Sequence, residues 1–158
     1  MSSPAHLVRR FFAHVGAHDL DGREREWVLG LIRPGETELF WRQSTGDQRH
    51  AVDTARKVAD LLPDNRTAQR AALWHDVGKV ESQLGALARV FATVARSLRV
   101  PRWQRWRDYD DHGPLGAARL ETLGCEPLVV AFARHHPHGP PPEYDADVWQ
   151  VLLNADDD

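Results

Sequence analysis

Side chains that can bind a metal ion recur on the apolar faces of the helices that the sequence predicts. The dipeptide His75-Asp76 ends an apolar helix, and adjacent helical side chains lie about 100° apart, so both can point into one cavity. His135 and His136 each continue an apolar stripe at spacings of three, four and seven residues. The full set of candidates is His50, His75, Asp76, His112, His135, His136 and Asp156.

This set of side chains favours a metal centre. A buried imidazole or carboxylate is costly unless it is paired or bound to a metal, and a single such histidine is ordinarily a hydrogen-bonded core residue. Imidazole and carboxylate ligands suit Fe, Mn, Zn or Ni, and the lack of thiolates disfavours a structural zinc site. Five histidines and two aspartates exceed what one four-coordinate ion needs. Two ions about 3.5–4 Å apart, bridged by a carboxylate, would use them all.

Helical periodicity runs through the chain, whereas strand patterns are nearly absent. The clearest apolar stripe lies in 81–98, and Gly78 stands where a C′ glycine would end the preceding helix. The predicted fold class is therefore all-α, a compact multi-helix bundle with short connections. Helices are predicted at 5–18, 23–32, 35–43, 47–62, 66–77, 81–98, 114–123, 127–137 and 145–156.

Length and composition predict a single globular domain over residues 1–158. The one cysteine, Cys125, excludes an internal disulfide framework, fits a reducing compartment and is expected to be inert. No apolar run approaches the roughly 18 residues of a membrane span, and the N-terminus lacks the apolar region of a secretory signal. A net charge of −3 disfavours nucleic-acid binding. We therefore expect a cytoplasmic protein that does not bind membranes.

The order of the candidate ligands resembles the HD-domain superfamily of metal-dependent phosphohydrolases. It is similar in particular to the seven-ligand, two-metal branch shared with HD-GYP cyclic-dinucleotide phosphodiesterases. Residues 75–79 (HDVGK) resemble the HDxGK motif of that group, and residues 112–116 (HGPLG) resemble its HxxxG helix start. After His136 the chain reads PHGPPP, so the GYP signature is absent and specificity for cyclic-di-GMP is not implied. The resemblance covers roughly residues 44–156, with 1–43 as accessory helices or a homodimer contact.

The resemblance implies a two-metal phosphohydrolase of the HD type. A hydroxide that bridges the two ions would hydrolyse a nucleotide or another small phosphoester, with Asp76 and Lys79 as the catalytic residues. Fe or Mn are the favoured ions, and Mg, Co, Ni or Zn are alternatives. By resemblance, one ion is held by His50, His75 and Asp156, the second by His112, His135 and His136, and Asp76 bridges the two.

Three alternatives stay open at this point. The first is an HD-fold di-iron oxygenase, because a histidine-rich bridged centre is equally apt for O₂. The second is a non-catalytic signalling module that binds a metal or a nucleotide. The third is a mononuclear enzyme that uses only His50, His75, Asp76 and Asp156.

Three further features have both a structural and a functional interpretation. Lys79 either contacts a phosphate as a point charge or stabilises a helix C-terminus. The segment 96–109, RSLRVPRWQRWRDY, either binds a phosphate-rich substrate or is a solvated helix with Trp103 and Trp106 packed inward. His138 either lines the mouth of the site or is a surface residue. His6, His14 and His18 are expected to be surface residues.

Overall fold

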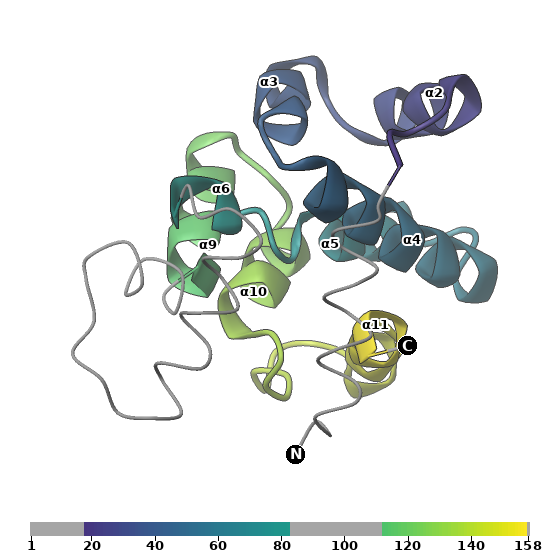
Figure 1. Cartoon of the computed structure of the whole chain (residues 1–158). Helices are drawn as coiled ribbons and strands as arrows, with labels where there is room; N and C mark the ends of the chain where they lie inside the picture. The colour runs from purple at the N-terminus through teal and green to yellow at the C-terminus, as the bar shows by residue number, and fades with distance from the viewer. Residues whose placement is uncertain (1–17, 83–111, 158) are drawn as a thin grey trace, which may run out of the picture.

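The structure is a computed structural model that describes residues 18–82 and 112–157. Every regular element in these two stretches is helical, which confirms the predicted all-α class (Figure 1). None of the described helices is long and apolar enough to cross a bilayer. The elements are α2 (Gly22–Leu31), the 3-10 helix η1 (Pro34–Glu36), α3 (Thr37–Trp41), α4 (Thr45–Leu61), α5 (Arg66–Trp74), α6 (Lys79–Ser82), α9 (His112–Thr122), α10 (Pro127–His135) and α11 (Ala146–Asp157).

Most predicted helices have a counterpart within two residues of the predicted start. The helix predicted at 35–43 is shorter and begins with η1, and the helix predicted at 66–77 ends early, at Trp74. The predictions for the helix at 5–18, for most of the helix at 81–98, for the segment 96–109 and for His6 and His14 lie outside the described residues.

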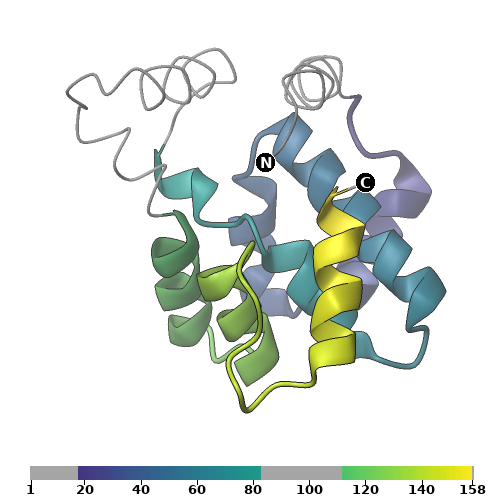
Figure 2. The same cartoon turned by 90° about the horizontal axis from the view of Figure 1, so that it is seen from below.

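Helix α5 is at the centre of the bundle and packs against α4, α10 and α11, while α9 packs on α10 (Figure 2). Large aromatic side chains fill the space between these helices: Trp74 is fully buried and meets Phe40 edge-on, with ring centroids 5.9 Å apart. Phe132 of α10 meets Trp149 of α11 in the same way at 5.2 Å. The C-terminal end of α5, where His75 follows, is therefore inside the molecule.

Side-chain caps set the start of the two helices that position the first candidate ligands. Ser44 caps α4, because its hydroxyl oxygen accepts a hydrogen bond from the backbone N–H of Asp47. Asn65 caps α5 in the same way through the N–H of Ala68. Local sequence thus fixes where α4 and α5 begin, and with that the register of His50 and His75.

A buried ion-pair network joins the N-terminal helices to the rest of the bundle. The Arg70 guanidinium of α5 donates to both oxygens of Glu36 at 2.9 and 2.6 Å and to the carbonyl of Leu31 at 2.9 Å. Its Nε also donates to Glu126, directly before α10, at 3.1 Å. Burial would raise the pKa of Glu36, but the hydrogen bonds from Arg70 hold that pKa below its usual value.

Gly78 has a different role from the predicted one. A C′ glycine ends a helix in the left-handed region, but among the described glycines only Gly124 has a positive φ, of 65°. Gly78 instead lies against the backbone of α9: a Cβ at this position would be 2.7 Å from the Gly116 amide nitrogen and closer still to the His112 carbonyl oxygen. The close approach of two backbones requires the glycine, and it places the turn 75–78 directly against the start of α9.

Candidate metal centre

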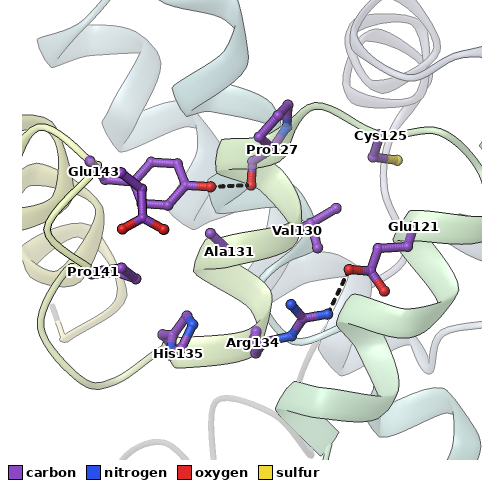
Figure 3. A pocket seen from close by; sticks show the side chains of 10 residues that line it. Glu121, Cys125, Pro127, Val130, Ala131, Arg134, His135, Pro141 and Glu143 are labelled. Atoms are coloured by element: carbon purple, nitrogen blue, oxygen red, sulfur yellow. Dashed lines mark hydrogen bonds and ion pairs between the residues drawn. The ribbon is translucent and has the colours of Figure 1, made fainter.

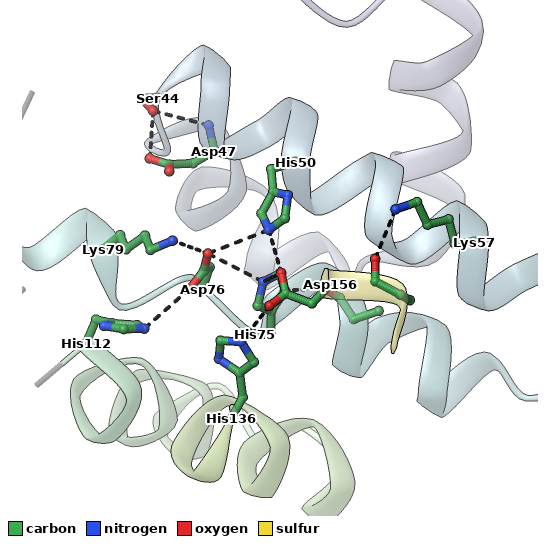
Figure 4. A network of polar contacts seen from close by, with 12 residues as sticks. Ser44, Asp47, His50, Lys57, His75, Asp76, Lys79, His112, His136 and Asp156 are labelled. Atoms are coloured by element: carbon green, nitrogen blue, oxygen red, sulfur yellow. Dashed lines mark hydrogen bonds and ion pairs between the residues drawn. The ribbon is translucent and has the colours of Figure 1, made fainter. Parts of the chain in front are cut away.

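Five helices bring histidine and aspartate side chains to one buried region (Figure 4). His50 comes from α4, and His75 and Asp76 come from the turn after α5. His112 is the first residue of α9, His136 directly follows α10, and Asp156 is in the last turn of α11. Each ligand candidate is thus close to the end of a helix, except His50, which lies within one.

His50, His75 and Asp156 form the first triad, whose potential ligand atoms all lie within 4.8 Å of one another. The Asp156 Oδ1 atom is 2.8 Å from His50 Nε2 and 3.2 Å from His75 Nε2. The His50 and His75 rings meet edge-on with centroids 5.2 Å apart. This triad contains the three residues that the resemblance assigned to one ion.

Asp76, His112 and His136 form the second triad, again with ligand atoms within 4.8 Å of one another. His112 Nε2 lies 3.4 Å from Asp76 Oδ1. His136 faces both triads, because its Nε2 atom also lies 2.8 Å from Asp156 Oδ2. The two triads of imidazole and carboxylate groups are therefore adjacent, with His136 in contact with Asp156 of the first.

Asp76 belongs to the second triad and also contacts the first. Its Oδ1 atom faces His112, while its Oδ2 atom is 3.4 Å from His75 Nε2 and 3.9 Å from His50 Nε2. A carboxylate that bridges two ions needs this disposition, with one oxygen toward each. Lys79 Nζ also contacts Oδ2 of Asp76. Lys79 is the first residue of the four-residue helix α6 and lies five positions after the end of α5, so it is not in the last turn of α5.

The two aspartates concentrate negative charge in a buried place. Burial would raise the pKa of Asp76, but Lys79 and His75 hold it well below its usual value. Burial would likewise raise the pKa of Asp156, but hydrogen bonds to His136 and His50 hold it far below that value. Burial would lower the pKa of His75, yet Asp76 and Asp156 raise it to about 10. The cluster is therefore built to bind positive charge.

The environment of His75 fits a metal ligand. Its Nδ1 atom is 2.7 Å from the carbonyl oxygen of Ala72, and such a bond fixes the ring and directs Nε2 toward the cluster. His75 Nε2 is fully buried, and although Asp156 Oδ1 and Asp76 Oδ2 lie 3.2 and 3.4 Å away, it makes no well-aligned hydrogen bond among the described residues. Buried polar atoms are rarely left in this state, and a cation between His75 and the two carboxylates would satisfy it.

The structure does not bring His135 to this cluster, so its assignment to the second ion disagrees with the geometry. His135 is exposed and lines a separate pocket of about 360 Å³ together with Tyr144 and Arg134 (Figure 3). α10 ends at His135, and the backbone of His136 leaves the helix with a ψ of 136°. The helix turns one histidine of the pair outward, and the change of backbone direction turns the other inward.

Comparisons with family models, with curated proteins and with solved structures give no match for this chain.

The remaining candidates lie away from the cluster. His18 and His138 are exposed, and His138 lies in the loop after α10, where its backbone carbonyl accepts a hydrogen bond from Trp149 Nε1 at 2.9 Å. The Cys125 thiol donates to Glu36 at 3.2 Å, and burial with Glu36 raises the pKa of Cys125 to about 12. A thiol in this state is a poor nucleophile, as expected from the sequence.

Sequence reasoning missed Lys57, which contacts the helix that carries Asp156. The sequence did indicate that Lys57 shares a helix face with His50, because it follows His50 by seven positions, or about two helical turns.

Proposed function

We propose that the chain is an HD-type metal-dependent phosphohydrolase that hydrolyses a nucleotide or another small phosphoester. The observation that carries the proposal is the position of Asp76, whose two carboxylate oxygens face two different triads of ligand atoms. Structural histidines in a core need one hydrogen-bond partner each, and that requirement does not explain why five other ligand-capable residues gather around the Asp76 carboxylate.

The donor set limits which ions fit. Both triads offer imidazole nitrogen and carboxylate oxygen, and the single thiol of the chain belongs to the Glu36 network instead. Such donors suit Fe or Mn, with Mg, Co, Ni or Zn as alternatives. Divalent ions supply Lewis acidity toward a phosphoryl oxygen and make water more acidic at neutral pH.

The chain's own residues prepare the site for an anionic ester. Asp76 and Asp156 are ionised and almost fully buried, so the cluster favours cations over water. Lys79 adds a positive charge at Oδ2 of Asp76, the oxygen that also faces His75, and a lysine there offers a point charge to a phosphoryl group. Phe132 and Trp149 form an apolar wall behind the cluster. Apolar side chains on this side of the cluster lower the local dielectric constant and so strengthen electrostatic interactions there.

The test combines metal content with turnover. Purified protein is assayed for ions per chain and then with a panel of nucleotides and other phosphoesters in the presence of the ion found. We expect phosphate release by the wild type, and loss of both turnover and metal in Asp76→Ala, because the shared ligand is gone. Asp60→Ala, which removes an exposed carboxylate from α4, is the matched control and should keep both.

Two other results would contradict the proposal. Substrate-dependent oxygen consumption without phosphate release would favour the di-iron oxygenase. Tight binding of metal or nucleotide with no turnover under any of the six ions would favour the signalling module.

A further inference from the structure

Lys57 and His50 lie on the same face of α4. Seven residues separate them, which is within about 20° of two full turns and about 10 Å along the axis. Both side chains contact the last turn of α11 (Figure 4). His50 meets the Asp156 carboxylate, whereas Lys57 Nζ donates to the backbone carbonyl of Ala155 at 3.2 Å. Helix α4 thus contacts the last turn of α11 twice, through the ligand candidate His50 and through Lys57, which is not a ligand candidate.

The last turn of α11 is stabilised when another helix supplies a positive charge and a hydrogen-bond donor to it. The final carbonyls of a helix have no partner within it, and they form the negative end of the macrodipole. Cations are stabilising at this place, but residues 154–157 read NADD and contain two acidic side chains instead. Lys57 supplies from α4 both a hydrogen-bond donor and a positive charge.

The position of this turn decides whether the first triad can form. Asp156 is buried, and it directly follows the residue whose carbonyl Lys57 holds. A shift of the last turn would move the Asp156 carboxylate away from His50 and His75, because the backbone carries the side chain with it. Residues that orient ligands in this way affect metal affinity by about 10–100-fold.

We propose that Lys57 is a positioning residue that keeps Asp156 in place for the first triad. The inference rests on the proposed function, since it takes Asp156 to be a metal ligand. The direct contact between His50 Nε2 and Asp156 Oδ1 involves the same atoms that an ion would use. The contact from Lys57 to Ala155 uses no ligand atom, so it serves equally with and without an ion.

The experiment measures Co²⁺ binding to the full chain by absorbance and chelator competition, in a His112→Ala background that removes a ligand of the second triad. Lys57→Met should weaken Co²⁺ binding at the first triad by about 10–100-fold. Lys57→Arg, which restores a donor and a charge, should bind within about threefold of the parent. The matched control Arg23→Met removes an exposed cation from α2 and should leave the affinity unchanged.

The outcomes separate this inference from the proposed function. If the wild type binds no Co²⁺, the metal centre itself is refuted. If the parent binds Co²⁺ and Lys57→Met binds it equally well, only the role of Lys57 is refuted. Failure of Lys57→Arg to restore binding also overturns that role. Helix content by circular dichroism is checked for each variant, and Lys57→Gln takes the place of Lys57→Met if the latter does not fold.

Discussion

His135 and His136 are adjacent in the chain, but their side chains lie on opposite sides of α10. His136 Nε2 is 2.8 Å from the Asp156 carboxylate, whereas the His135 side chain is exposed beside Tyr144 in a separate pocket. The helix ends between them, so only the second histidine reaches the cluster. The two residues therefore form a matched pair for mutagenesis.

His136→Ala should lose one of the two ions, because it removes a ligand of the second triad. The loss of activity should exceed the roughly 10–100-fold typical of residues that only orient ligands. His135→Ala should keep both ions and most of the activity. Elemental analysis and phosphoester turnover of the two variants check this prediction, and equal loss of metal in both would contradict the geometry of α10.

Gly78→Ala should destabilise the protein, because the added methyl group would collide with the backbone of α9. We expect a loss near the upper end of the roughly 1–3 kcal/mol typical of overpacking. Gly30→Ala is the control, since nothing lies within 4 Å of a Cβ there and Gly30 is inside α2. It should stabilise the protein by about 0.5–1 kcal/mol. Urea unfolding of both variants gives the comparison, and similar effects would argue against the close approach of Gly78.

Arg70→Met should be strongly destabilising. It leaves the Glu36 carboxylate buried without its partner, and breaking such a pair costs about 3–5 kcal/mol. Arg33→Met breaks the exposed ion pair with Glu126 and should cost about 1 kcal/mol or less. Denaturant midpoints measure both changes. Losses of equal size would mean that the network around Arg70 does not join the N-terminal helices to the bundle.

Glu24 should make stability depend on acidic pH. A hydrogen bond from Arg49 lowers its pKa to about 2, against about 4.5 in the unfolded chain. The unfolded state therefore takes up the proton first, and the contribution of Glu24 is full above about pH 4.5 and is lost as the pH falls toward 2. The difference in free energy of unfolding between wild type and Glu24→Gln should shrink between pH 6 and pH 3. A difference that does not change with pH would contradict the ion pair.

Apolar periodicity predicted most of the described helices. The structure adds local start signals, the Ser44 cap of α4 and Pro127 at the first position of α10. The same periodicity placed six of the seven ligand candidates on faces that do converge. The end of α5 at Trp74 was not predicted, and the contact of Gly78 with α9 in the turn that follows involves residues distant in sequence. Likewise, nothing in the local pattern around His135 and His136 tells which one faces inward, because both continue an apolar stripe.

Metal content per chain tests the central claim most directly. Freshly purified wild-type protein, analysed for all first-row transition metals and magnesium, should contain close to two ions per chain. Asp76→Ala should contain clearly less. A wild type that retains no ion, and that takes up none when incubated with Mn²⁺, Fe²⁺ or Co²⁺, would contradict the account.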